Sequence, residues 1–119
     1  MSIRDKVISL LGRQFKPYVK RSPEWFELRR KWLDKHPFCA ACGGTEKLEV
    51  HHIVPVHIDP SRELDETNLI TLCEAKDRNC HFVFGHFHNW YAWNPNVIED
   101  TKHYLEEKKE AYEKIGKKI

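Results

Sequence analysis

Two cysteine pairs, Cys39/Cys42 and Cys73/Cys80, account for all four cysteines of this 119-residue chain. In a protein that keeps its thiols reduced, such pairing is typical of a tetrahedral zinc site. The two-residue spacer of the first pair lets backbone amides face both sulfurs, and Gly43 relaxes the turn. Six residues separate Cys73 from Cys80, so this segment must form a loop for both sulfurs to bind one ion. We therefore expect a structural zinc site with four cysteine ligands, with disulfides or free core thiols as the competing interpretation.

Histidines lie between the two cysteine pairs and directly after the second pair. His51 and His52 are adjacent, and His81 follows Cys80 directly, so His81 could replace it as the fourth zinc ligand. A neutral imidazole can accept a proton near pH 7 and is a common metal ligand. Without the cysteines, His51 and His52 would be interpreted as structural histidines at a strand end.

The hydrophobic pattern predicts the elements that must position these residues. We expect a helix near residues 3–11, a basic connector to Arg21, and a second helix from Ser22-Pro23 to His36-Pro37. Strands are expected over 48–54 and 69–73, helical structure over 80–92, and a last helix over 97–115.

The last predicted helix carries apolar pairs that recur every seven residues. These pairs are Val97/Ile98, Tyr104/Leu105 and Ala111/Tyr112. Three heptads are too few to indicate a coiled coil, so we favour a helix packed on the domain over a dimer seam.

The charge distribution is uneven. Residues 1–38 hold ten basic and four acidic side chains, whereas residues 39–99 hold four basic and nine acidic ones. A basic arm beside an acidic, histidine-rich centre suits a protein that binds phosphate and cations, although a solvated surface gives the same pattern. The candidate phosphate contacts are Lys16, Lys20, Arg21, Arg29 and Arg30.

No stretch is long and apolar enough to predict a transmembrane helix, and no signal-peptide cleavage site follows the N-terminus. We therefore expect a cytoplasmic protein with no membrane partner.

The order of these motifs resembles that of the HNH nucleases, whose core is the ββα-metal fold. The matching segments are Cys39–Gly43, Leu48–Pro55, Asn68–Cys73 and Cys80–His81. Residues 85–90 and Asn94-Pro95 resemble the tail of compact bacterial and phage members. The resemblance covers about residues 22–95 and implies an α+β fold with a small ββα-metal core, a structural zinc site and flanking N- and C-terminal helices.

The expected organisation is a single domain, residues 1–119. It comprises a basic N-terminal helix and connector (1–21), the zinc-stapled core (22–95) and the C-terminal helix (96–119).

The resemblance also implies roles for individual residues. His52 matches the general base, and Asn68 matches the residue that orients it. His51 and His81 match the ligands of a catalytic divalent ion. His86 and His88 are possible additions that could bind phosphate or complete the ligand set, or simply flank an aromatic core.

The implied catalytic ion is Mg²⁺ or Mn²⁺, distinct from the structural Zn²⁺. Magnesium prefers oxygen ligands, and imidazoles suit Mn²⁺, Ni²⁺ or Co²⁺ better, so the histidine at position 51, often aspartate in relatives, favours those ions.

The expected function is a metal-dependent DNA endonuclease that nicks double-stranded DNA, acting as a monomer or weak dimer. The alternatives are a non-catalytic zinc module that binds nucleic acid, an accessory protein of a larger phage packaging or restriction machine, and a metal-dependent RNase.

Overall fold

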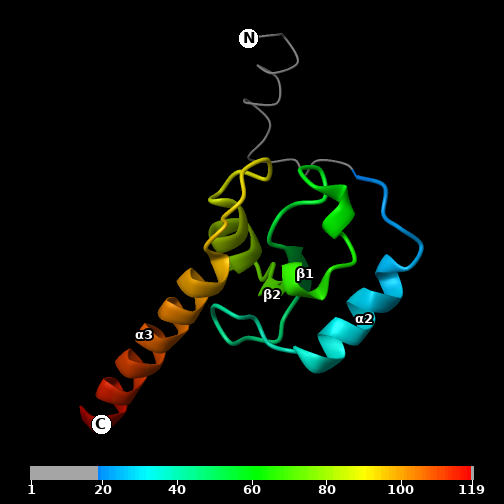
Figure 1. The fold of residues 1–119 in the computed structure, drawn as a ribbon. Coiled ribbons are helices and arrows are strands. Elements are labelled where there is room, and N and C mark those ends of the chain that lie inside the picture. Colours follow the sequence, from blue (N-terminus) through cyan, green and yellow to red (C-terminus); the bar gives the residue numbers. More distant parts are fainter. Residues whose placement is uncertain (1–18, 119) are drawn as a thin grey trace, which may run out of the picture.

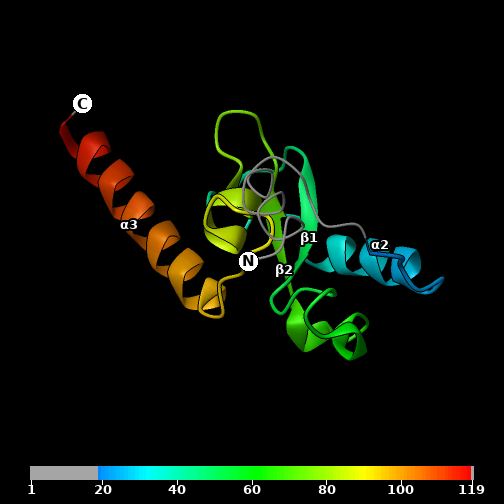
Figure 2. The ribbon, with the colours of Figure 1, turned by 90° about the horizontal axis from the view of Figure 1, so that it is seen from above.

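The computed structural model describes residues 19–118, so the helix expected near residues 3–11 lies outside the described part of the chain. The elements in order are α2 (Trp25–Lys35), β1 (Leu48–His52), β2 (Leu69–Cys73), a π-helical turn (His81–Gly85) and α3 (Val97–Lys118). Two short 3-10 turns lie between the strands. The strands form the centre, with α2 on one side and α3 on the other (Figures 1 and 2). The expected α+β fold of two antiparallel strands and flanking helices is confirmed.

The two strands pair from Leu48 opposite Cys73 to His52 opposite Leu69. The first strand ends two residues earlier than its sequence predicts, because the Asn68 side chain takes over the backbone of Val54. Its Oδ1 accepts a hydrogen bond from Val54 N at 2.8 Å, and its Nδ2 donates to Val54 O at 3.0 Å. The chain therefore leaves the sheet immediately after the histidine pair.

Helix α2 covers one face of the sheet. Trp25 is buried against Val50 and Leu69, and the Trp32 indole donates a hydrogen bond to Thr71 Oγ1 at 3.0 Å. The helix ends at Lys35 as predicted, because the residue before Pro37 is disfavoured in helical conformation.

The opposite face of the sheet packs against the cysteines and the segment that follows them. Ile70 and Leu72 share a buried cluster with all four cysteines and with Val97, the first residue of α3. Strand alternation therefore divides the sheet between two cores, one on each face.

The helical segment expected over residues 80–92 is much shorter in the structure. It consists mainly of one π-helical turn, His81–Gly85. Phe87 and His88 then adopt positive φ angles of 52° and 62°, which an α-helix cannot continue through.

Helix α3 extends to Lys118, three residues beyond its predicted end, and projects from the rest of the fold (Figure 1). Val97 and Thr101 are buried, but Ile98 is 51% exposed and Tyr112 is 65% exposed. The predicted packing of this stripe on the domain holds for its first two pairs: Val97 is buried, and the Tyr104 ring lies 5.0 Å from the Phe84 ring. The last pair, Ala111/Tyr112, is exposed and extends beyond the core. Among residues 19–118, no helix is long and apolar enough to cross a membrane.

Candidate metal centres and active site

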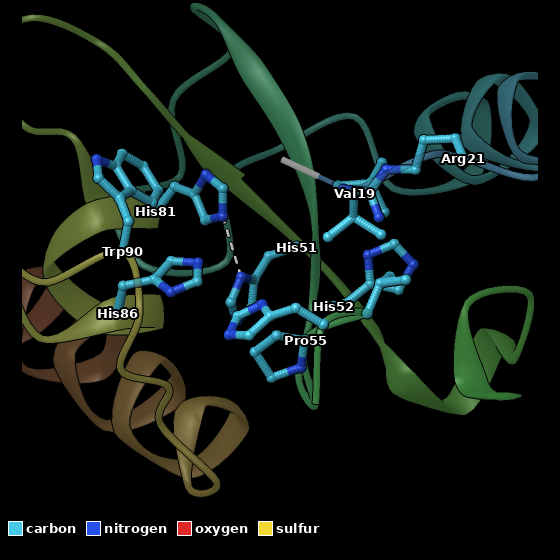
Figure 3. A pocket seen from close by; sticks show the side chains of 11 residues that line it. Val19, Arg21, His51, His52, Pro55, His81, His86 and Trp90 are labelled. Carbon is cyan, nitrogen blue, oxygen red and sulfur yellow. Dashed lines mark hydrogen bonds between the residues drawn. The ribbon is translucent and has the colours of Figure 1, made fainter. Parts of the chain in front are cut away.

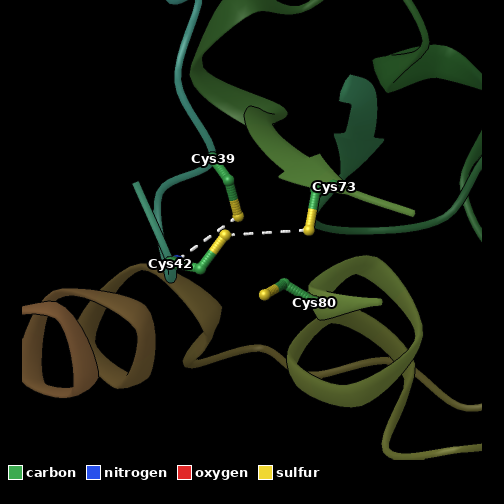
Figure 4. Close-up of side chains that lie close together, drawn as sticks. All are labelled: Cys39, Cys42, Cys73 and Cys80. Carbon is green, nitrogen blue, oxygen red and sulfur yellow. Dashed lines mark hydrogen bonds between the residues drawn. The ribbon is translucent and has the colours of Figure 1, made fainter. Parts of the chain in front are cut away.

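The four cysteines converge in the buried interior, from the turn after α2, from the end of β2 and from the start of the π-helical turn (Figure 4). Their sulfurs all lie within 4.8 Å of one another, and the Cys42 and Cys73 sulfurs are 3.8 Å apart. A zinc ion with Zn–S bonds of about 2.3 Å places tetrahedral sulfurs about 3.8 Å apart. The spacing of the thiols is therefore consistent with a structural zinc ion.

The turn around the first cysteine pair has the geometry that its spacing predicts. Gly43 has a φ of 75°, in the left-handed region that favours glycine. The amide of Cys42 donates to Cys39 Sγ at 3.5 Å, and the amide of Gly44 donates to Cys42 Sγ at 3.4 Å. These amides favour thiolates, which are the forms that bind zinc.

The thiols also affect one another electrostatically. A hydrogen bond from the Cys80 thiol lowers the pKa of Cys39 to about 4, against the opposing effect of burial. The same hydrogen bond and burial raise the pKa of Cys80. Four thiolates cannot coexist in this space without a cation, so the donor set fits a divalent ion.

The wide spacer of the second pair forms a closed turn. Asn79 donates its amide hydrogen to Ala75 O at 2.7 Å and has a φ of 40°, which returns the chain to Cys80. Cys80, and not His81, completes the sulfur cluster, because the His81 ring is directed toward a second group of ligands.

That second group contains His51 from β1 and His81 and His86 from the π-helical turn and its end. One ring nitrogen from each lies within 4.8 Å of the others. His51 Nδ1 and His81 Nε2 are only 3.0 Å apart (Figure 3). Adjacent nitrogens of an octahedral ion with bonds of about 2.1 Å have nearly this separation, about 3.0 Å. The geometry therefore fits a divalent transition-metal ion.

The outer hydrogen bonds of two of these rings orient them for metal binding. His81 Nδ1 lies 3.0 Å from Glu74 Oε1, and His86 Nδ1 lies 2.7 Å from Ala92 O. A carboxylate and a carbonyl only accept, so each Nδ1 carries the hydrogen and each Nε2 keeps its lone pair. Histidine ligands of metals are usually held in this way.

His51 is held neutral by its surroundings. Burial lowers its pKa well below the usual value for histidine, and the nearby His81 and His86 act in the same direction. Its Nε2 is buried and has no hydrogen-bond partner among the described residues. A neutral ring is the form that a metal ligand requires, and the nitrogen that faces the cluster is Nδ1, 3.0 Å from His81 Nε2.

The π-helical turn explains why His86 joins the cluster. An α-helix rotates residues five apart by about 140° relative to each other, whereas a π-helix with its wider turn brings them together. His88, seven residues after His81, is exposed and contacts Phe82. Gly85 makes room for the cluster, because a Cβ there would lie 3.0 Å from His51 Cε1.

His52 points to the other face of β1, toward α2. Its ring lies 4.5 Å from the Trp25 ring, and its Nε2 lies 2.8 Å from Glu63 O. Since the carbonyl accepts, Nε2 carries the hydrogen and Nδ1 keeps its lone pair. Burial lowers the pKa of His52, which keeps the ring neutral, although the Glu63 carbonyl opposes this shift.

Although they face opposite sides of the strand, both histidines line the same cavity of about 110 Å³. They can do so because β1 ends at His52. The other polar residues that line the cavity are Arg21, His57, His81, His86 and Trp90. Figure 3 shows Arg21 and His52 on one side and His81 and His86 on the other, with His51 between them. A bound group could therefore contact the imidazole of His52 and the three-histidine cluster together.

Asn68 is fully buried beside this site but makes no hydrogen bond to His52. Its amide binds the backbone of Val54 and reaches Arg62 O at 3.4 Å, one residue before the carbonyl that receives the His52 hydrogen bond. The contacts of Asn68 therefore hold the loop, and the Glu63 carbonyl orients the ring.

The basic candidates occupy different environments. Lys16 lies outside the described residues, Lys20 is exposed, and Arg21 lies over the Trp25 ring at 5.5 Å, beside the cavity.

Arg29 and Arg30 already have acidic partners. Arg29 pairs with Glu49 at 3.1 Å, and Arg30 pairs with Glu27 at 2.7 Å and with Asp34 at 3.2 Å. Of the candidates that the structure describes, Arg21 is the one placed at the histidine site.

Several contributors to the site carry no motif. The carbonyls of Glu63 and Ala92 leave no signal in side-chain chemistry, and His57, which lines the cavity, stands in no motif of the sequence. Glu74 could have been noticed, because an acid directly after a predicted metal ligand can bind a neighbouring histidine.

In a comparison with known families, residues 39–82 match the model of the HNH endonucleases. Comparisons with curated proteins and with solved structures give no match. The matched segment begins at Cys39 and includes both strands, all four cysteines, His51, His52 and His81. Residues 39–82 are therefore an HNH endonuclease domain, which implies a metal-dependent nuclease that hydrolyses phosphodiester bonds.

Proposed function

We propose that this protein is a DNA endonuclease that nicks double-stranded DNA, with His52 as the general base and a divalent ion held by His51, His81 and His86. The observation that carries the proposal is the shared cavity. It joins a neutral imidazole with a free Nδ1 to three imidazoles whose nitrogens converge on one point.

His52 is suited to accept the proton of an attacking water. Its Nδ1 keeps a lone pair because Nε2–H donates to Glu63 O, and the ring is fixed against Trp25. A base held in one tautomer and one orientation loses little entropy when it acts.

The three-histidine cluster supplies the second requirement of phosphodiester hydrolysis. A divalent ion bound there would stabilise negative charge on the phosphate and on the leaving 3′ oxygen. Three imidazole ligands favour Mn²⁺, Ni²⁺, Co²⁺ or Zn²⁺ over Mg²⁺, which prefers oxygen. We therefore expect Mn²⁺ or Ni²⁺ to support more cleavage than Mg²⁺ at equal concentration.

Arg21 is the proposed contact for a phosphate at the edge of the cavity. Its guanidinium lies over Trp25, on whose ring His52 also rests. This stacking positions a planar donor group next to the base, where it can bind phosphate oxygens.

The test is incubation of purified, zinc-loaded protein with supercoiled plasmid and with a matched RNA, in Mg²⁺, Mn²⁺, Ni²⁺ or EDTA. Wild type is expected to give open-circle DNA only with metal. The variant His52→Ala should lose about 10²–10⁴-fold in rate while retaining its fold. The control is His103→Ala, because His103 is on the surface of α3, paired with Glu107.

Each contrary outcome has a definite meaning. Cleavage that survives in His52→Ala would show that another group is the base. Binding of DNA without cleavage in any metal would indicate a non-catalytic module, and preferential cleavage of RNA would make the protein an RNase.

A further inference from the structure

Glu74 lies outside the cavity but contacts one of the cavity's histidines. Its Oε1 lies 3.0 Å from His81 Nδ1, and the side chains are only 24% and 12% exposed, respectively. We propose that Glu74 is a positioning residue that fixes His81 for metal binding and supplies negative charge to the site. This inference rests on the proposed role of the three-histidine cluster as a metal site.

The hydrogen bond determines which nitrogen of His81 is available. A carboxylate can only accept, so it holds the hydrogen on Nδ1 and leaves the lone pair of Nε2 facing His51 Nδ1, 3.0 Å away. If the hydrogen moved to Nε2, it would point into the cluster and block metal binding. Glu74 therefore selects the tautomer that binds an ion.

The charge of Glu74 matters as well as its geometry. Three neutral imidazoles leave the charge of a divalent ion uncompensated, whereas a carboxylate behind one of them offsets part of it and makes that imidazole a stronger ligand. The partner of His86 Nδ1 is the uncharged carbonyl of Ala92, so the two outer contacts are not equivalent. Glu74, unlike the Ala92 carbonyl, places a negative charge behind its histidine.

The chain places Glu74 and His81 by means of the cysteines. Glu74 directly follows Cys73, and His81 directly follows Cys80. The Glu74 amide also donates to Lys47 O at 2.8 Å, which fixes its backbone at the end of β2. Closing the sulfur cluster therefore also sets the distance between the carboxylate and the imidazole.

The experiment measures Mn²⁺ and Ni²⁺ binding by calorimetry to zinc-loaded wild type, Glu74→Gln and Glu74→Ala. Glutamine keeps an accepting oxygen but loses the charge, so we expect affinity to fall about 10-fold. Alanine loses both, and we expect a fall of up to about 100-fold. The control is Asp77→Asn, an exposed acid in the same insert that pairs with Arg78.

Zinc content and melting temperature are measured on the same samples. The inference requires both to stay at wild-type values in Glu74→Gln and the Asp77→Asn variant to bind the second ion normally. The ion concentration for half-maximal nicking should also rise in the Glu74 variants, with the rate at saturating ion changing only a few-fold.

Contrary results separate this inference from the proposed function. If wild type binds no second ion, the proposed metal site itself fails. If wild type binds the ion and Glu74→Gln and Glu74→Ala bind it equally well, only the role of Glu74 is overturned. Loss of zinc from Glu74→Gln, or weaker binding in Asp77→Asn, would likewise overturn it, in favour of a structural or general charge effect.

Discussion

The two ligand clusters are neighbours in the chain but differ in donors, closure and access. The four-cysteine cluster is complete and buried among Ile70, Leu72 and Val97. The three-histidine cluster has one donor fewer and borders a cavity of about 110 Å³. Closed four-ligand sites are typical of structural zinc, and sites with an open position are typical of catalysis. The difference supports our proposal that the cysteine cluster holds the fold and that the histidine cluster carries the chemistry.

The chain builds both clusters from the same elements. Cys73 precedes Glu74 and Cys80 precedes His81, so each pair of adjacent residues gives one sulfur to the cysteine cluster. The second residue of each pair is either a ligand of the histidine cluster, His81, or the carboxylate that contacts it, Glu74. The structural site therefore positions the outer and inner parts of the histidine site. Loss of the cysteine cluster should therefore disturb the histidine cluster, whereas loss of the histidine cluster should leave the cysteine cluster intact.

The largest expected effect comes from removing zinc. The apparent binding free energy of structural zinc is about 10–16 kcal/mol in small zinc domains, and the fold described here joins α2, β2 and the π-helical turn through the cysteines. We expect a strong chelator to unfold the protein and zinc to restore it. Circular dichroism follows the folded state, and zinc analysis of the same samples gives the bound zinc. A native spectrum in zinc-free protein would show that the cysteine cluster is not needed for the fold, which would contradict the difference proposed between the two clusters.

Loss of a histidine ligand should affect ion binding and spare the fold. His86→Ala removes one of three donors, so the affinity for Mn²⁺ or Ni²⁺ should fall by at least about 100-fold, the upper end of the loss seen for outer partners. His88→Asn is the matched control, because His88 is exposed and asparagine tolerates its φ of 62°. Equal affinities of the two variants would exclude His86 from the site.

A methyl group at Gly85 should sharpen the comparison by crowding the histidine site alone. The new Cβ would lie 3.0–3.2 Å from three atoms of the His51 ring, so we expect a loss of about 1–3 kcal/mol in the free energy of unfolding and weaker ion binding. Gly116→Ala is the control, since a Cβ there meets nothing within 4 Å. Thermal melts that are unchanged in Gly85→Ala would show that the π-helical turn does not pack as described.

The smallest effects concern the basic residues. Arg21→Gln should reduce the salt dependence of DNA binding by about one phosphate contact. Arg30→Gln should change it less, because Arg30 is already paired with Glu27 and Asp34. Binding isotherms at several salt concentrations compare the two, and an equal loss in both variants would contradict the special position of Arg21.

The cysteine spacing predicted its cluster well because thiolate pairs on short turns have few other uses in a reduced protein. The strands were also predictable, from apolar runs that flank the histidines. The early end of β1 was not, because it depends on the buried Asn68 amide binding the Val54 backbone from 14 residues away.

The histidine site was only partly predictable for a related reason. The sequence pattern was interpreted with α-helical geometry, which puts His88 and not His86 on the face of His81. The π-helical turn reverses this. The groups that accept hydrogen bonds from the site histidines are the Glu74 side chain and the backbone carbonyls of Ala92 and Glu63. Their positions follow from the fold alone.

The most direct test compares substitutions at two adjacent residues, Cys80→Ser and His81→Ala, by counting bound metal ions per chain and recording the melting temperature of each variant. The account predicts that Cys80→Ser loses zinc and its native fold. It predicts that His81→Ala retains zinc and a near-native melting temperature but loses the second ion and metal-dependent nicking. If His81→Ala lost zinc, or if both variants bound the same ions as wild type, the division of labour between the two clusters would be contradicted.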